Sequence, residues 1–259
     1  MGQTAIGTPD LNFRIHDRTL CVAPLTRAGL LADLSDRLRA GRGFALATIN
    51  LDHLVKLPRD REFLDAYARH DLVVADGNPV VWLSRLARTP VELVTGSDLI
   101  EPLARIAAET GTPLALVGST ETALQGAEDS LRARVPGLEI AVRIAPPMGF
   151  APLGDQGAEV IKALATSGAG LCLVALGAPK QEIFAARAHA ALPHMGFASI
   201  GAGLDFIAGQ QRRAPMRMQR IAMEWLWRML SDPRRLLLRY TRCALILPGL
   251  AWRAWRMRA

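Results

Sequence analysis

Short apolar runs alternate with longer amphipathic segments along most of the chain. Runs of about four to eight apolar residues bounded by turn residues are typical of the buried strands of a parallel sheet. The six runs are FALATIN at 44–50, LVVAD at 72–76, PLALVG at 113–118, LEIAVRI at 138–144, GLCLVALG at 170–177 and FASIGAG at 197–203. The segments between them have helical spacing, as in Thr122–Arg134 and Gly157–Ser167. This alternation predicts an α/β fold, a Rossmann-like parallel sheet with helices on both faces.

The pattern changes near Arg212, where the chain becomes helical, basic and rich in tryptophan. We therefore expect a Rossmann-like core over residues 1–211 and a helical appendage over residues 212–259. Seven arginines of the appendage recur at helical spacing, and they are Arg213, Arg217, Arg220, Arg228, Arg235, Arg239 and Arg242. Arginine interleaved with tryptophan and leucine is typical of a helix that lies in a membrane interface. The apolar run Cys243–Trp252 is too short to span a bilayer.

The distribution of charge supports this division. The chain of 259 residues carries a formal net charge of +7. Residues 212–259 hold twelve arginines against Glu224 and Asp232, a net charge of +10, so the remainder of the chain carries −3. We favour a membrane surface or a lipid diphosphate as the partner of the appendage. A solvated face on a helix that packs against the core stays open as an alternative, whereas nucleic acid is disfavoured because no recognised module accompanies the basic stripe.

The cysteines and the first ten residues indicate the compartment. Cys21, Cys172 and Cys243 are odd in number, widely spaced and set among apolar residues, which favours buried thiols in a reduced compartment. The segment MGQTAIGTPD has no basic stretch followed by an apolar one, so we expect no secretory signal. The pattern for myristoylation also fails, because Ile6 stands where serine or threonine is needed. These features predict a cytoplasmic protein.

Polar residues stand at the ends of three predicted strands. Asp76, followed by Gly77, ends the run LVVA, and the carboxyl ends of parallel strands are where such folds bind ligands. Asp76 is therefore either a helix cap or the chemical centre of the protein. Thr48 and Asn50 can hydrogen-bond a sugar or a phosphate, although such residues are more often turn and cap residues. In GAPKQE a turn leads into a helix that bears Gln181, where free N–H groups bind anions or the helix is simply capped.

Several kinds of cofactor chemistry have no signal in the sequence. The stretch IGAGLDF lacks the third glycine of the dinucleotide fingerprint, so we expect no NAD or FAD. The five histidines form no close pair with ligand spacing and no Asp-x-Asp occurs, so we expect no metal. Cys172 lies in mid-strand without an evident base, which argues against covalent catalysis. A departing diphosphate would then be neutralised by arginine, lysine, helix N-termini or backbone amides.

The order of the motifs resembles the WecG/TagA/CpsF family of bacterial glycosyltransferases. The motifs are TINLDH, ADGNPVVWLSR, VTGSDL, LVGS, ALGAPKQE, IGAGLDFIAG, RRAP and MEWLWRMLSDPRRLLLRY. The resemblance covers residues from about Asn12 to Tyr240. It implies metal-independent transfer with inversion from a UDP-sugar to an undecaprenyl-diphosphate-linked saccharide, with N-acetylmannosamine, its uronic acid or glucose as the sugar. It also implies a protein peripheral to the inner face of the cell membrane, whose appendage docks there and completes the active site.

The resemblance also implies roles for individual residues. Asp76 matches the family's proposed catalytic base. The implied binding residues are Thr48, Asn50 and Gln181 for the sugar and diphosphate, Asp205 for the nucleotide, and Arg228, Arg235 and Arg239 for the diphosphates of donor or lipid. One departure is Leu93, which stands where the family often has arginine. Arg85, Arg88 or an appendage residue would then replace that arginine, or the donor is held differently.

Two other functions stay open from the sequence. A non-catalytic membrane-associated scaffold or sugar-nucleotide sensor would keep the pocket without depending on Asp76. A nucleic-acid-binding protein would bind more weakly as salt rises. The intact set of Thr48, Asn50, Asp76 and Gln181 favours the enzyme. The sequence is compatible with a monomer whose core uses its own appendage. It is equally compatible with a homo-oligomer whose subunits exchange appendages, so both assemblies stay open.

Overall fold

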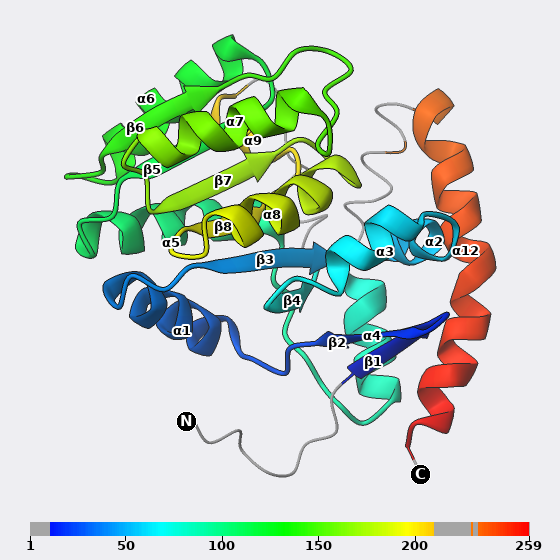
Figure 1. The fold of residues 1–259 in the computed structure, drawn as a ribbon. Coiled ribbons are helices and arrows are strands. Elements are labelled where there is room, and N and C mark those ends of the chain that lie inside the picture. Colours follow the sequence, from blue (N-terminus) through cyan, green and yellow to red (C-terminus); the bar gives the residue numbers. More distant parts are fainter. Residues whose placement is uncertain (1–10, 210–228, 230–232, 259) are drawn as a thin grey trace.

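The computed structural model describes residues 11–209, 229 and 233–258. Its centre is a six-stranded parallel sheet in the order β4-β3-β8-β7-β5-β6 (Figure 1). The strands are β3 (Phe44–Ile49), β4 (Leu72–Ala75), β5 (Leu114–Gly118), β6 (Ile140–Ile144), β7 (Leu171–Ala175) and β8 (Gly196–Ser199). Each coincides with one of the six predicted runs, and all the pairings in this sheet are parallel. The predicted α/β, Rossmann-like fold is confirmed.

Helices connect these strands and follow the last of them. They are α1 (Arg27–Arg39), α2 (Leu51–Lys56), η1 (Leu57–Arg59), α3 (Arg61–Tyr67), α4 (Asn78–Leu86), α5 (Gly96–Glu109), α6 (Glu121–Arg134), α7 (Asp155–Thr166), α8 (Lys180–Ala191), α9 (Gly203–Ile207) and α12 (Pro233–Arg256). The helices predicted near 122–134 and 157–167 correspond to α6 and α7. Thr26, Thr95 and Thr120 each accept a backbone N–H at the start of α1, α5 and α6. A threonine in this position satisfies one of the free N–H groups of the first turn.

Both faces of the sheet are covered, because successive strand residues enter different hydrophobic clusters. Leu46 of β3 and Leu173 of β7 pack with residues of α1, α5 and α6. Cys172 and Val174 face the other way and pack with α7 and α8. Alternation with a period of two sends neighbouring side chains to opposite faces. A parallel sheet buried on both sides therefore reads as a continuous apolar run in the sequence.

The chain leaves the neighbouring strands β3 and β8 toward opposite faces of the sheet. After β3, the helices α2 and α3 follow, and α3 packs against α8. After β8, the helix α9 packs against α5 and α6 on the other face. Open α/β sheets bind ligands in the crevice that such a divergence creates at the carboxyl ends of the strands. The end of the sheet between β3 and β8 is therefore the expected position of a site.

An N-terminal hairpin was not among the predicted elements. Its strands β1 (Leu11–Ile15) and β2 (Arg18–Val22) pair antiparallel around a two-residue turn. The turn residue His16 has a φ of 52°, a conformation that hairpin turns usually mark with asparagine or glycine. Because that mark is missing, the two short strands give no clear signal. The hairpin covers the outer edge of β4, where the Ala23 N–H donates to the Val73 carbonyl at 2.8 Å.

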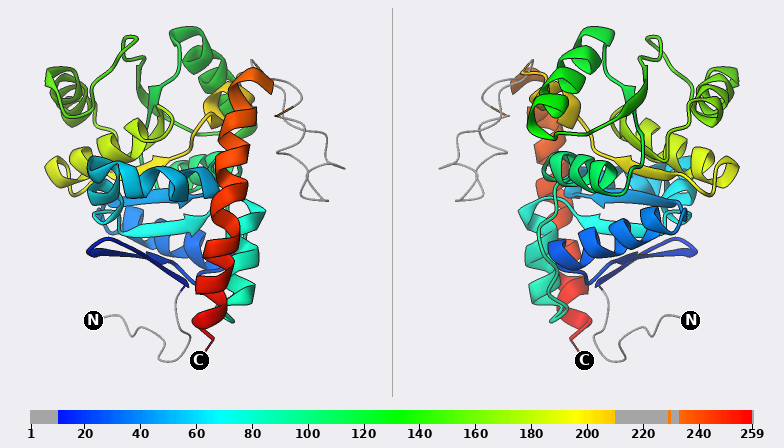
Figure 2. Two further views of the ribbon diagram at one scale, coloured as in Figure 1. Left: turned by 90° about the vertical axis from the view of Figure 1, so that its right-hand side faces the viewer. Right: turned by 90° about the vertical axis from the view of Figure 1, so that its left-hand side faces the viewer.

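The helix α12 runs along the side of the molecule toward which β3 and β7 point (Figures 1 and 2). It packs against α2 and α4, and Ala254 joins the hydrophobic cluster of the hairpin and β4. This confirms a helix over residues 233–256, whereas the predicted boundary at residue 212 lies outside the described residues and stays a prediction. No helix in the described part of the chain combines the length and the apolar composition that crossing a membrane requires.

Candidate active site

Asp76 and Thr48 lie side by side at the carboxyl ends of two paired strands. The register of β3 and β4 places Ile49 opposite Ala75, and the Asp76 N–H continues the ladder by donating to the Ile49 carbonyl at 2.8 Å. The Thr48 hydroxyl donates to Asp76 Oδ2 at 3.4 Å. The helix α4 has Gly77 as its N-cap, with no side-chain cap bond. Gly77, and not Asp76, is therefore the N-cap residue of this helix, which begins at Asn78.

Gly77 explains how the chain turns so sharply after Asp76. Its φ is 97°, a region that residues with a Cβ rarely adopt. The turn leaves Asp76 half-buried at the edge of the sheet, and α4 starts at once behind it. Leu93 forms a bridge with Ala75 and is 41% exposed. The position at which the family often has arginine is thus next to the end of β4, close to Asp76 along the strand.

Asn50 is both a helix cap and a candidate ligand. Its Oδ1 accepts the His53 backbone N–H at 3.1 Å and so begins α2. Its Nδ2 lies 3.4 Å from His53 Nε2. The predicted cap is confirmed. Nδ2 carries two N–H groups, and one of them points to His53 Nε2. The second N–H group can donate to a ligand.

Gln181 is more deeply buried than a residue on a pocket wall usually is. It is 2% exposed, its Oε1 accepts the Gly201 N–H at 3.0 Å, and its Nε2 donates to Glu182 Oε1 at 2.7 Å. The amide of Gln181 thus joins the start of α8 to the loop after β8. Its predicted contact with a sugar or diphosphate stays a prediction. Sequence reasoning gave no role to Glu182, because a glutamate in the first turn of a helix is ordinarily exposed.

The buried Glu182 carboxyl makes stability depend on pH. Burial raises its pKa from the ordinary 4.5 to about 7, although the bond from Gln181 acts in the opposite direction. Between these values the folded state holds a proton that the unfolded state has lost, so the free energy of unfolding falls as the pH rises through this window. Between pH 4.5 and pH 8, we expect the free energy of unfolding of the Glu182→Gln protein to fall by on the order of 3 kcal/mol less than that of the wild type. Urea unfolding at each pH measures this difference.

The exposed Glu159, also on a helix, is the matched position for this experiment. Glu159→Gln should keep the pH dependence of the wild type. A Glu182→Gln protein with an unchanged slope would show that the carboxyl of Glu182 is ionised in the folded protein at neutral pH.

Asp205 lies farther along the same end of the sheet. It is on α9, and it accepts a hydrogen bond from the hydroxyl of Ser119, the residue after β5. In the strand order, β8 and β7 stand between β3 and β5, so Ser119 lies roughly 14 Å from Thr48 at the usual spacing between strands. The structure does not bring Asp205 into the group formed by Thr48, Asn50 and Asp76. The motif LVGS contained Ser119, but only the fold shows its partner.

Arg239 of the appendage reaches the core near the end of β3. Arg239 Nε lies 3.2 Å from Asp52 Oδ1, and Asp52 also pairs with Lys56 at 2.8 Å. Lys56 Nζ in turn donates to the Ala178 carbonyl at 3.4 Å, before α8. Arg239, Asp52 and Lys56 therefore link α12, α2 and the turn after β7. Arg228 lies outside the described residues, and of Arg235 the structure describes the backbone in α12 but not the side chain.

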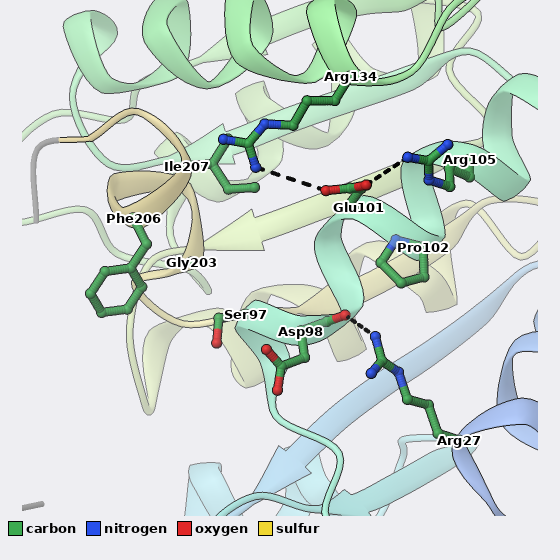
Figure 3. Close-up of a pocket in the computed structure, with 10 residues that line it drawn as sticks. All are labelled: Arg27, Ser97, Asp98, Glu101, Pro102, Arg105, Arg134, Gly203, Phe206 and Ile207. Carbon is green, nitrogen blue, oxygen red and sulfur yellow. Dashed lines mark hydrogen bonds and ion pairs between the residues drawn. The ribbon is translucent and has the colours of Figure 1, made fainter. Parts of the chain in front are cut away.

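A cavity of about 460 Å³ opens beside α9 (Figure 3). Its walls include Gly203 and Phe206 of α9 and the first two turns of α5. Figure 3 shows Glu101 between two arginines, Arg105 at 2.7 Å and Arg134 at 3.8 Å. None of the predicted site residues lines this cavity. Arg27 donates to the backbone carbonyl of Asp98 at 2.9 Å on another wall of the cavity.

Among the described residues no group of three or more histidine, cysteine, aspartate or glutamate side chains is placed to hold a metal ion. Cys172 and Cys243 are buried as predicted, whereas Cys21 is exposed, so the prediction of a buried thiol was wrong for Cys21. Burial raises the pKa of the Cys172 thiol, which keeps it protonated and unreactive. At the carboxyl ends of β3 and β4, Thr48 and Asp76 are hydrogen-bonded and Asn50 follows the end of β3. The role of Asp76 as the catalytic base stays a prediction.

A comparison with known protein families gives one match. Residues 15–259 match the family described as "Glycosyl transferase WecG/TagA/CpsF family". The match begins in the hairpin and extends through α12, so it includes each residue of the site discussed above.

Proposed function

The chain belongs to the WecG/TagA/CpsF family of glycosyltransferases, and from this premise we propose that it transfers a sugar from a UDP-sugar to a polyprenyl-diphosphate-linked saccharide. The donor sugar would be N-acetylmannosamine, its uronic acid or glucose. The family places this chemistry in the synthesis of cell-surface polysaccharide. The observation that carries the proposal is the hydrogen bond between Thr48 and Asp76 at the carboxyl end of the sheet, next to Asn50, whose side chain caps α2.

A single displacement accounts for inversion at the anomeric carbon. The acceptor hydroxyl attacks that carbon, the new carbon–oxygen bond forms as the bond to UDP breaks, and the hydroxyl proton passes to Asp76. Thr48 holds the carboxylate through its hydroxyl. Arg239 and Lys56 offer positive charge for the departing diphosphate. Asp205, farther along the edge, is assigned to the nucleoside end of the donor.

The outer face of α12 supports docking on a membrane. Leu238, Leu245 and Trp252 are spaced by seven residues and are 59%, 75% and 56% exposed. Basic side chains flank them, among them Arg242 and Arg253. A merely solvated face would be polar throughout, whereas apolar and basic residues together suit the boundary between headgroups and acyl chains. We place the protein on the inner face of the cell membrane for this reason.

The test of this function is transfer to a synthetic polyprenyl-diphosphate-saccharide in detergent. UDP-N-acetylmannosamine, its uronic acid, UDP-glucose and UDP-glucuronic acid are offered in parallel, with and without EDTA. We expect one donor to be used and the rate to survive EDTA. UDP binding without transfer from any donor would favour the sugar-nucleotide sensor instead.

Arg239 gives a second test, of how the diphosphate is held. Its ion pair with Asp52 uses Nε, and the guanidinium carries further N–H donors on its terminal nitrogens. Because a charged hydrogen bond contributes about 1.5 to 3 kcal/mol, we expect Arg239→Gln to raise the KM for the donor or the lipid acceptor about tenfold or more. Steady-state kinetics measure this change. Arg39→Gln, which breaks an exposed pair with Asp36 on α1, is the control, and equal KM values in both variants would remove Arg239 from the site.

A further inference from the structure

We propose that His53 and Tyr67 form a buried positioning pair that fixes the amide of Asn50 and the end of β3 for the reaction. The inference rests on the proposed function, because it assigns a task to residues behind that site. Both side chains are buried. His53 is 5% exposed and Tyr67 is 1% exposed. His53 is the last residue of the motif TINLDH and has no metal-ligand partner at suitable spacing in the sequence.

The two rings are held firmly in place behind the end of β3. Phe63 packs edge-on against both, with ring centroids 5.6 Å from His53 and 5.1 Å from Tyr67. His53 Nδ1 and the Tyr67 hydroxyl lie 2.6 Å apart. The hydroxyl donates to the Thr48 carbonyl at 2.8 Å. The pair thus connects α2 and α3 to Thr48, the second-last residue of β3.

The direction of every bond in this network follows from one fixed group. Asn50 Oδ1 accepts the backbone N–H of His53, so the nitrogen of the amide is the atom that faces His53 Nε2. An amide nitrogen only donates. His53 Nε2 must therefore accept, and its ring proton must lie on Nδ1, from which it donates to Tyr67.

The network requires His53 to be neutral. A second ring proton, on Nε2, would face the N–H group of Asn50, and two donors would meet. Burial lowers the pKa of His53 to about 3, so the ring stays neutral at any pH at which the enzyme would work. A neutral ring with one tautomer gives Asn50 one orientation, since its oxygen and one N–H are both used.

The same chain of bonds ends beside the proposed base. Tyr67 holds the carbonyl of Thr48, and the hydroxyl of the same threonine donates to Asp76. A shift of β3 by a fraction of an ångström would therefore move Thr48, Asn50 and the support of Asp76 together. Reacting groups must be held within about half an ångström of their working positions. His53 and Tyr67 meet this need from buried positions.

The first experiment reads the tautomer directly. Long-range proton–nitrogen NMR spectra of histidine-labelled wild-type protein distinguish a protonated from an unprotonated ring nitrogen, and His53→Gln assigns the signals. We expect His53 to be neutral with its proton on Nδ1. A proton on Nε2, or a charged ring at pH 7, would overturn the inference. The result does not depend on whether sugar transfer is detected.

The second experiment compares variants of the wild-type enzyme once its transfer activity is in hand. His53→Gln keeps an acceptor for Asn50, whereas His53→Leu removes it. We expect His53→Leu to lower kcat/KM about tenfold or more, with substantial recovery in His53→Gln. In an Asn50→Ala background the two variants should have equal activity, because the group that His53 positions is gone. Equal activity of the two variants with Asn50 intact would overturn the inference, as would an equal difference in both backgrounds.

Discussion

Replacing Asp76 by asparagine is expected to reduce sugar transfer by a factor of about 10² to 10⁴, the usual contribution of a general base. An amide cannot accept the proton that the acceptor hydroxyl must lose. The change is nearly isosteric, and the amide oxygen can still accept the Thr48 hydroxyl that now donates to Asp76 Oδ2. The fold and the affinity for UDP should therefore stay close to those of the wild type. The loss should fall on kcat rather than on the KM for the donor.

The measurement is single-turnover transfer together with UDP binding for the same protein. Asp129→Asn makes the same chemical change at an exposed position of α6, where the carboxylate accepts Gln125 Nε2 at 2.9 Å. This control should transfer at the wild-type rate. Wild-type activity in Asp76→Asn would remove this carboxylate from the chemistry and return the protein to the class of sensors or scaffolds.

The second large effect is expected on the outer face of α12. The triple variant Leu238→Ser, Leu245→Ser and Trp252→Ser should bind lipid vesicles about 10² times more weakly. Each of these side chains is more than half exposed, and insertion of such a chain into an apolar phase contributes about 1 kcal/mol or more. Three of them together contribute about 3 kcal/mol, which corresponds to that factor.

Co-sedimentation with vesicles measures this binding, with neutral lipids and with a fraction of anionic lipids. The flanking arginines predict stronger binding to the anionic vesicles and weaker binding as salt rises. The folded state should persist, because the three side chains are on the side of α12 away from α2 and α4. Leu153→Ser changes an exposed leucine elsewhere, 51% exposed before α7, and serves as the control. Binding that is unaffected in the triple variant would assign the outer face to a protein partner instead.

The fold could be predicted from the sequence because burial on both faces leaves a direct mark on it. In β3 and β7 every side chain is buried, so the runs are apolar without interruption. The hairpin of β1 and β2 leaves no such mark. Half of its residues face solvent, and its turn contains His16 instead of a residue that favours positive φ. Neither the residue pattern nor the turn residues of this segment predict a hairpin, so its structure depends on packing against β4.

The site could be predicted only in part, for a different physical reason. Asp76 and Asn50 stand at strand ends, where the fold class alone directs attention. Other contacts at this end of the sheet join distant parts of the chain, as in the bond between Tyr67 and Thr48 or that between Ser119 and Asp205. Nothing in the local sequence tells a buried tyrosine or glutamate from an exposed one.

The contact of α12 with the N-terminal hairpin has a consequence for the way the protein is made. Leu11 and Val22 share one hydrophobic cluster with Ala254, which the ribosome adds some 240 residues after Leu11. Until that part of the chain emerges, the hairpin, α2 and α4 have an uncovered apolar surface. The nascent protein is therefore exposed to aggregation and to chaperones for most of its synthesis. A chain that ends before α12 would keep this apolar surface uncovered even after its synthesis is complete.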